Sequence, residues 1–175
     1  MKENKNQEKH MVRRIDKINY YLNIAKTVAE RSTCLRKFVG CVIVNNDEII
    51  ATGYNGAPRG RKNCNELGYC SKKKFFPELR HAGYDACRSV HAEQNAIISA
   101  RRKDMIGATL YLVLYDPETD EYEKGASSCQ MCRKLIINAG IKQVIVRDGN
   151  DDGYKVIDVQ EWIDKDDLLE GKITY

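Results

Sequence analysis

The sequence has 175 residues, enough for one compact domain and too few for two. Its hydrophobic share of 42% and charged share of 31% are typical of a globular protein, and its apolar runs are far too short to cross a bilayer. The first nine residues are polar and lack the apolar core of a signal peptide. We therefore expect a cytoplasmic protein with no membrane association.

The net charge of +4 is unevenly distributed along the chain. Residues 1–37 contain ten Lys and Arg against four Asp and Glu, whereas residues 148–175 contain three against nine. A basic end can bind nucleic acid, but here the charges follow one amphipathic helix without interleaved aromatic residues. We interpret them as a solvated helix face and do not expect a nucleic-acid partner.

In the first half of the chain, hydrophobic spacing predicts a helix and a hairpin. Apolar residues recur at three- and four-residue spacing over residues 16–31, which indicates an amphipathic helix. Strands are predicted over 38–44 and 48–52, joined by a turn at Asn45-Asn46-Asp47. Residues 57–90 form an irregular insertion. A segment of that length without a core of its own is normally functional or held by other means.

The second half alternates helices and strands. Because a strand-helix-strand unit favours a right-handed crossover, we predict an α/β fold. It is a three-layer α/β/α sandwich with a mixed sheet of about five strands. We treat residues 1–175 as one domain, with residues 150–175 as a C-terminal helical extension. The predicted helices are 91–101, 129–139 (stopped by Gly140) and 159–169; the strands are 108–115 and 142–147, with a polar loop over 116–127.

Two short motifs contain the residue types of a metal site. His91 and the pair Cys129 and Cys132 each open a predicted helix that follows a loop. Cysteines three residues apart point to the same side of a helix, and the helix N-terminus favours their thiolate forms. One imidazole and two thiolates fill three of the four positions around zinc, which leaves one open, as in catalytic zinc sites.

Glu93, two residues after His91, is predicted to transfer protons instead of binding the metal. It is displaced from His91 by about 200° on an ideal helix, so the two do not share a face. Near the helix N-terminus its carboxylate can act as a general base and acid. The pattern His-x-Glu followed by Cys-x-x-Cys is the known signature of zinc deaminases. The alternative interpretation is a purely structural zinc or an unligated core.

These motifs resemble the deoxycytidylate (dCMP) deaminases of the cytidine deaminase-like superfamily. The resemblance spans roughly residues 12 to 147 and rests on four segments. They are Arg31-Ser-Thr-Cys34 leading into Val39-Gly-Cys-Val-Ile-Val44, Gly53-Tyr-Asn-Gly-Ala-Pro58, His91-Ala-Glu-Gln-Asn-Ala-Ile97, and residues 129–141.

The resemblance implies roles for further residues and partners. Asn55 would bind the sugar of the substrate, Ala92 would pack beneath the pyrimidine ring, and Asn95 would lie on the phosphate side of the pocket. The resemblance also implies a homo-oligomer, with a hexamer favoured, and regulation by dCTP and dTTP. Ser128 replaces the proline that usually precedes the first cysteine; because Ser is a good N-cap, we expect metal binding to survive.

A second, structural zinc is a further hypothesis, for which related dCMP deaminases give precedent. Clustered thiols in a reducing compartment more often indicate metal binding or catalysis than disulfides. Four of five residues would hold this zinc and stabilise the polar insertion. The alternative is a set of free thiols and an exposed histidine, and Cys41 is assigned to the core. The five residues are Cys34, Cys64, Cys70, His81 and Cys87.

The predicted reaction is the hydrolysis of dCMP to dUMP and ammonia. One alternative retains the chemistry and changes the substrate to CMP, a nucleoside, or a base in nucleic acid. Another is a non-catalytic accessory protein that keeps the zinc fold, but such a protein would not need Glu93. We interpret Lys72-Lys73-Lys74 as a solvated loop. Arg88, beside the predicted site, can contact a phosphate.

Overall fold

The computed structural model of the chain describes residues 14–79, 86–149, 152–166, 168, 169 and 171. No helix in this part of the chain is both long and apolar enough to cross a membrane. His81, one of the five residues proposed for a second metal, lies outside the described residues.

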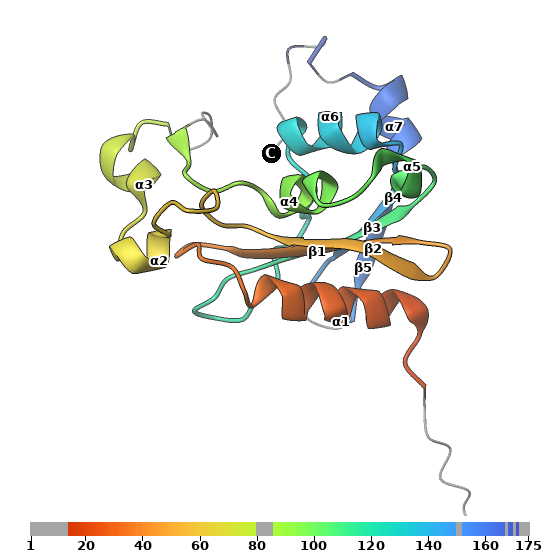
Figure 1. Cartoon of the computed structure of the whole chain (residues 1–175), viewed down its shortest axis with the longest axis horizontal. Coiled ribbons are helices and arrows are strands. Elements are labelled where there is room, and N and C mark those ends of the chain that lie inside the picture. The colour runs from red at the N-terminus through yellow and green to blue at the C-terminus, as the bar shows by residue number, and fades with distance from the viewer. Residues whose placement is uncertain (1–13, 80–85, 150–151, 167, 170, 172–175) are drawn as a thin grey trace, which may run out of the picture.

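Five strands form one mixed sheet through the middle of the domain (Figure 1). They are β1 (Phe38–Asn45), β2 (Glu48–Tyr54), β3 (Thr109–Tyr115), β4 (Gln143–Arg147) and β5 (Tyr154–Asp158). Their order is β2-β1-β3-β4-β5, in which β3 and β4 are parallel and the other neighbours antiparallel. The predicted α/β fold with about five strands is therefore confirmed.

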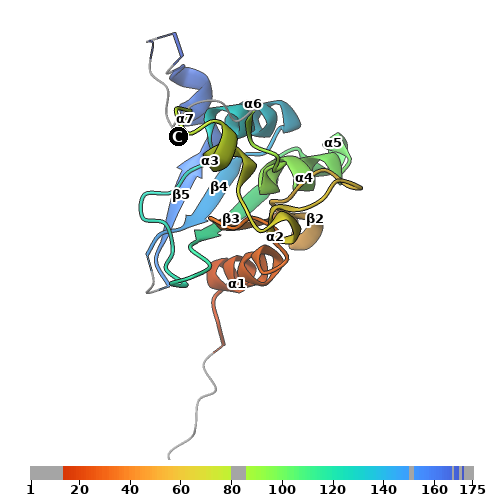
Figure 2. The same ribbon diagram turned by 90° about the vertical axis from the view of Figure 1, so that its left-hand side faces the viewer.

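Helices on both faces of the sheet give the three predicted layers. They are α1 (Lys17–Ala29), α2 (Cys64–Leu67), α3 (Ser71–Phe75), α4 (Ala92–Ile98), α5 (Arg102–Met105), α6 (Gln130–Ala139) and α7 (Val159–Asp164). The first of these covers one face, and α4, α6 and α7 cover the other (Figure 1). Figure 2, seen from the side of α2 and α3, shows the sheet between these layers.

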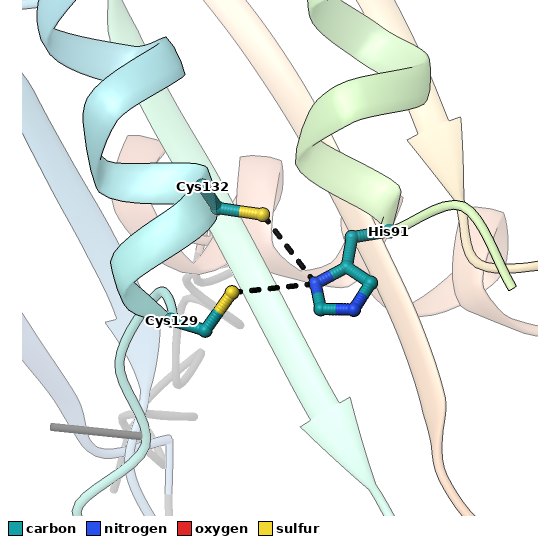
Figure 3. A group of neighbouring side chains, drawn as sticks. All are labelled: His91, Cys129 and Cys132. Atoms are coloured by element: carbon teal, nitrogen blue, oxygen red, sulfur yellow. Dashed lines mark hydrogen bonds between the residues drawn. The ribbon is translucent and has the colours of Figure 1, made fainter. Parts of the chain in front are cut away.

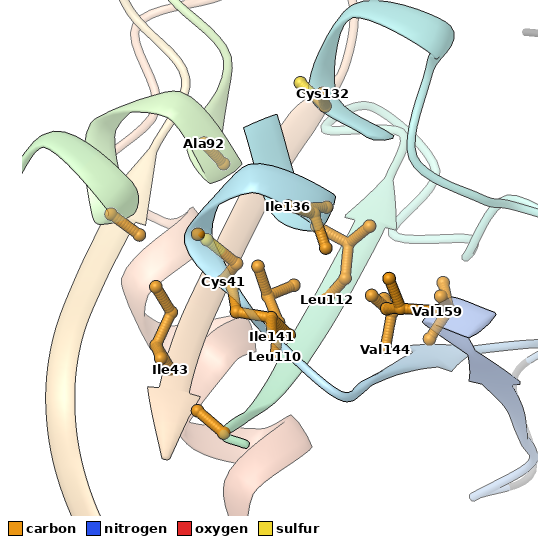
Figure 4. Packing of buried hydrophobic residues seen from close by; sticks show 14 of the residues in the cluster. Cys41, Ile43, Ala92, Leu110, Leu112, Cys132, Ile136, Ile141, Val144 and Val159 are labelled. Carbon is orange, nitrogen blue, oxygen red and sulfur yellow. The ribbon is translucent and has the colours of Figure 1, made fainter. Parts of the chain in front are cut away.

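Each face of the sheet has its own hydrophobic core, since the side chains of a strand alternate between its two faces. Cys41, Ile43, Leu110 and Leu112 belong to the core beneath α4 and α6, together with Cys132 (Figure 4). Val42, Val44, Tyr111 and Val113 belong to the core against α1. The prediction that Cys41 is a core residue is confirmed, because it is fully buried.

A glycine on β2 sets the position of α4. A Cβ atom added to Gly53 would overlap the carbonyl oxygen of Ala92 and lie 2.5 Å from the nitrogen of Ala96. Any larger residue would therefore push the helix away from the sheet. The helix that begins just after His91 lies directly on the strand for this reason.

The insertion over residues 57–90 is less irregular than predicted, because it contains α2 and α3. Both helices are short; α2 ends at Gly68 in a left-handed conformation with φ of 71°. The two ends of the insertion meet in an isolated bridge between Gly56 and Val90, with backbone hydrogen bonds of 3.2 and 2.8 Å. The insertion thus begins and ends at this bridge, and its end leads directly into His91.

The C-terminal region differs from the prediction of a helical extension over residues 150–175. Its described part contains strand β5, and α7 ends at Asp164, well before the predicted end at residue 169. Only Ile157 of β5 is buried, so the strand shows no alternation that would mark it in the sequence. It forms because its backbone pairs with β4. Hydrophobic periodicity does not indicate pairing of this kind between neighbouring strands.

The remaining differences lie at the ends of elements. The predicted helix over 91–101 ends at Ile98, and the short helix α5 follows it. The hairpin turn is where it was predicted, with positive φ at Asn46 and Asp47. Gly140 ends α6 in the left-handed conformation, as its sequence position indicated.

Candidate active site

The N-terminal ends of α4 and α6 meet beside the sheet and bring the predicted metal ligands together. His91 is the N-cap of α4 and Cys129 is the N-cap of α6, with Cys132 in the first turn. The Nδ1 atom of His91 lies 3.5 Å from the Sγ of Cys129 and 3.4 Å from the Sγ of Cys132 (Figure 3). In the described part of the chain this is the one group of three or more potential ligands gathered within 4.8 Å.

The chemistry of this group fits zinc. One imidazole nitrogen and two sulfurs are ligands that zinc prefers in tetrahedral sites, and three protein ligands leave the fourth position open. Both sulfurs are shielded from solvent, since Cys129 is 7% exposed and Cys132 is fully buried. The Nδ1 atom faces both sulfurs in Figure 3, so all three donors can approach a single ion.

The two thiols are coupled electrostatically. A hydrogen bond from Cys132, aided by His91, lowers the pKa of Cys129 to about 4 despite its burial. The same bond, together with burial, raises the pKa of Cys132. Burial lowers the pKa of His91, but the bond to Cys129 and the charge of Glu93 outweigh it and leave this pKa raised. These interactions favour the thiolate at Cys129, which is the form of cysteine that binds zinc.

Glu93 lies in the first turn of α4, behind His91, and its side chain is almost completely buried. Burial raises the pKa of its carboxyl above the ordinary value, although the positive charge of His91 acts in the opposite direction. A carboxyl group with a raised pKa can both accept and donate protons near neutral pH. Glu93 also lines the pocket described next, as its predicted role requires.

A pocket of about 500 Å³ opens beside the three predicted ligands. Its wall includes Asn55 and Ala92, two of the three residues expected to contact substrate. The pocket is also rich in positive charge, because five Lys and Arg side chains line it against two Glu. The five basic residues are Arg36, Lys37, Lys72, Arg88 and Lys124.

Asn55 is buried and holds the pocket wall together. Its Oδ1 accepts hydrogen bonds from Ser32 Oγ at 2.6 Å and from the backbone nitrogen of Val39 at 3.0 Å, while its Nδ2 donates to the carbonyl of Lys37 at 3.0 Å. The bond from a backbone N–H fixes which atom is the oxygen. An amide nitrogen has two hydrogens, so Asn55 retains one that can bind a ligand.

The structure does not bring Asn95 to this pocket. Its Nδ2 donates to the carbonyl oxygen of Tyr54 at 2.8 Å, and it is absent from the described residues that line the pocket. Asn95 therefore joins α4 to the end of β2. The N-cap expectation for Ser128 is also corrected: Cys129 occupies the cap, and Ser128 lies one residue before it.

Four further cysteines also reach this pocket. Cys34, Cys64, Cys70 and Cys87 all line it, and none forms a disulfide. Burial raises the pKa of the Cys64 thiol, and the other three are close enough to raise it further. The four thiols are therefore neighbours, although they are not gathered as tightly as the group at His91.

The structure corrects the interpretation of Lys72 as part of a solvated loop. Its exposed fraction is only 9%, it lines the pocket, and its charge acts on His91. Nothing in the run Lys72-Lys73-Lys74 distinguishes the first lysine from the others. The distinction arises from α3, which turns Lys72 toward the pocket.

Comparison with known proteins agrees with this site. The family model described as "Cytidine and deoxycytidylate deaminase zinc-binding region" matches residues 15–147. The chain is 38% identical over 130 residues to a deoxycytidylate deaminase of Mycobacterium phage D29, covering 72% of this chain and 90% of that protein. It is 37% identical over 130 residues to the Schizosaccharomyces pombe deoxycytidylate deaminase, covering 73% of this chain but only 35% of that longer protein.

A solved structure shows the same likeness. The dCMP deaminase of cyanophage S-TIM5, in complex with dCMP and dUMP, is 29% identical and has a TM-score of 0.50. The match covers 74% of this chain and 79% of that one. The resemblance expected from the four sequence segments is thus confirmed, and the chain belongs to the cytidine and deoxycytidylate deaminase family of zinc-binding proteins.

Proposed function

We propose that this protein is a zinc-dependent deaminase that hydrolyses dCMP to dUMP and ammonia. The observation that carries the proposal is the gathering of His91, Cys129 and Cys132 within 4.8 Å of one another. They lie beside a pocket that His91, Cys129 and buried Glu93 line. The names of the phage relatives and the bound nucleotides of the S-TIM5 enzyme support the choice of substrate.

His91, Cys129 and Cys132 would hold the zinc ion through Nδ1 and the two Sγ atoms. When bound there, zinc would activate a water molecule for attack on the ring. The protein contributes the preformed geometry, because both ligand-bearing helices are anchored on the sheet. Ala92, fully buried beside His91, forms the floor on which the pyrimidine ring packs.

Glu93 moves the protons of the reaction. Its carboxylate accepts a proton from the attacking water and delivers it to the ring nitrogen. It then accepts the second proton, from the hydroxyl group now bonded to the ring carbon, and delivers it to the amino group, which leaves as ammonia. Burial keeps the carboxyl away from bulk water, and the raised pKa lets the same group act as base and then as acid. The need for such a group argues against a non-catalytic accessory role.

The basic wall of the pocket supports a nucleoside monophosphate as substrate. Arg88 donates through Nη2 to the carbonyl oxygen of Lys62 at 2.9 Å, while its buried Nε has no hydrogen-bond partner among the described residues. A buried N–H group without a partner is costly, and a phosphate oxygen would satisfy it. We assign Arg88 and Lys72, which both line the pocket, to the phosphate, and the second amide hydrogen of Asn55 to the sugar.

The pocket offers less support for a base within a nucleic-acid strand. Proteins that hold single strands stack the bases on aromatic side chains. Phe, Trp and Tyr are absent from the described residues that line the pocket. CMP and cytidine remain the alternatives that share its chemistry.

A second, structural zinc is supported by the neighbouring thiols of Cys34, Cys64, Cys70 and Cys87. They alone supply four ligands, so His81 is not needed. Zinc would draw the four sulfurs together and fix α2 and α3 at the pocket. Metal analysis of the purified protein should give two zinc ions per chain, and one in the Cys64→Ser variant. A single zinc in the parent protein would contradict this proposal.

Self-association and regulation follow from the family resemblance. The edge strand β5 exposes Tyr154 and Val156, which supports a homo-oligomer, for which we favour a hexamer. Effector binding by dCTP and dTTP and a cytoplasmic location also belong to this proposal. Light scattering with and without each nucleotide tests the assembly.

A substrate panel tests the central proposal. The protein is incubated with dCMP, CMP, deoxycytidine, cytidine and a cytosine-containing oligonucleotide, and ammonia release is followed with and without dCTP and dTTP. We expect dCMP to be the best substrate. Turnover of the oligonucleotide alone would overturn the nucleotide assignment, and turnover of none would favour a binding protein.

A further inference from the structure

The segment that leads into Cys129 must be held firmly, because it carries a metal ligand and also forms one wall of the pocket. Ala126 and Ser127 line the pocket, and Ser128 is fully buried between them and Cys129. The side-chain hydroxyl of Ser128 has no hydrogen-bond partner among the described residues. Its influence on Glu93, whose pKa it lowers slightly, is the weakest of the named causes, so most of the support of the segment must come from other residues.

Arg133, one turn along α6, contacts this segment in two places. Its Nε donates to the carbonyl oxygen of Ser128 at 2.8 Å, and its Nη2 donates to Ser127 Oγ at 3.3 Å. The carbonyl of Ser128 belongs to the peptide group that joins it to Cys129. Because that group is planar, fixing its oxygen also fixes the backbone nitrogen and Cα of Cys129.

Trp162 of α7 lies against the other side of Arg133. The guanidinium carbon of Arg133 is 5.0 Å from the centre of the Trp162 ring, within the range of a cation–π contact. Trp162 also packs against the core beneath α6. The beginning of α7 is anchored by buried Val159 and by the cap of Asp158, whose carboxylate accepts from the nitrogen of Gln160 at 2.9 Å.

We propose that Arg133, held in place by Trp162, is a positioning residue that sets the orientation of Cys129 toward the metal. The proposal rests on the proposed function, since it assumes that His91, Cys129 and Cys132 bind zinc. The flat guanidinium group can hold two acceptors at once in a fixed geometry, which a lysine cannot do. Partners that orient a ligand in this way typically change metal affinity by about 10- to 100-fold when they are removed.

The test measures zinc release from the intact, zinc-loaded protein to an excess of a coloured chelator. The release that is absent in the His91→Ala variant belongs to this site. We expect Arg133→Met, which keeps the aliphatic stem, to release that zinc about 10- to 100-fold faster. The rate of zinc release from Arg133→Lys should lie between the rates of Arg133→Met and the parent protein.

Arg102→Met is the matched control. Arg102 Nε donates to the carbonyl oxygen of Asn138 at 2.9 Å, at the far end of α6 from the site. The Arg102→Met variant loses the same kind of hydrogen bond, but far from the site. Its zinc release should therefore equal that of the parent protein. If Arg133→Met behaves like Arg102→Met, Arg133 does not position Cys129 and the inference is wrong.

A double variant tests the part assigned to Trp162. If Trp162 acts through Arg133, Trp162→Leu should speed zinc release, but it should add nothing in the Arg133→Met background. Full additivity would overturn the link between the two residues. If the parent protein and His91→Ala release equal amounts of zinc, the proposed metal site itself is wrong; that outcome is separate from a failure of the Arg133 variants.

Discussion

Two groups of cysteines face one pocket, and they are built in different ways. Cys129 and Cys132 belong to a helix that packs on the sheet, and with His91 they lie within metal-binding distance of one another. Cys34, Cys64, Cys70 and Cys87 come from short helices and loops and lie near one another without such close packing. Secondary structure thus preorganises the first group, whereas the second would need the proposed second zinc to gather its four sulfurs.

This difference suggests two separate roles: the group at His91 serves the reaction, and the insertion with the other cysteines shapes the pocket. A reaction needs ligands and a proton carrier in fixed positions before substrate arrives. The insertion with its cysteines contributes Lys72 and Arg88 to the wall, so it is suited to choosing the substrate.

The largest effect is expected at Glu93. Glu93→Gln removes the proton carrier and keeps the shape of the side chain, so we expect kcat to fall by about 10²- to 10⁴-fold. Zinc content, measured by atomic emission, should remain that of the parent protein. Loss of zinc in this variant would mean that Glu93 binds the metal, and its assignment as a proton carrier would be wrong.

The next effect concerns substrate choice by the insertion. Arg88→Met removes a hydrogen bond to a charged phosphate, worth about 1.5–3 kcal/mol, so kcat/KM for dCMP should fall by about 10- to 100-fold. The value for deoxycytidine, which has no phosphate, should change little. Exposed Arg59 is the control, because it does not line the pocket. An equal loss on both substrates would mean that Arg88 supports the fold and does not read the phosphate.

Gly53 tests how firmly the catalytic helix depends on the sheet. Gly53→Ala places a methyl group against the backbone of α4, and overpacking of this kind costs about 1–3 kcal/mol. We expect a lower free energy of unfolding in urea, together with weaker zinc binding, because His91 moves with the helix. Thr52→Ala, at an exposed neighbouring position, should have neither effect.

The smallest effect is expected far from both groups, at the hairpin turn. The Asp47 carboxylate accepts hydrogen bonds from Lys17 at 2.6 Å and from Tyr21 at 2.7 Å, and these lower its pKa. An acid whose pKa is lowered by folding stabilises the protein above its unfolded pKa, near 3.8, and loses this contribution as the pH falls through the folded pKa.

Asp47→Asn should therefore be slightly less stable than the parent protein at pH 7, with no effect on zinc release. The difference in urea midpoint should shrink as the pH falls below 4. A difference that stays constant across this range would assign the stabilisation to the shape of the side chain instead of its charge.

Much of the fold could be predicted because its signals are local. Hydrophobic periodicity located α1, β1 and α6 to within two residues at either end, and Gly140 marked the end of the last. Strand β5 could not be predicted, because four of its five residues are exposed and only pairing with β4 makes it a strand. The short helices of the insertion could not be predicted, since segments of four and five residues are too short to show a hydrophobic period.

The residue types and spacing of His91, Glu93, Cys129 and Cys132 determine, within the sequence itself, that this chain carries a zinc-deaminase motif. Their chemistry requires those side chains at the N-terminal ends of helices, and a short segment of sequence around each one is enough to predict that position. Tertiary structure alone decided which other residues join them. Lys72 turns inward and Asn95 turns away, and Arg133 reaches back to the peptide before Cys129, because packing of distant elements sets where each side chain points.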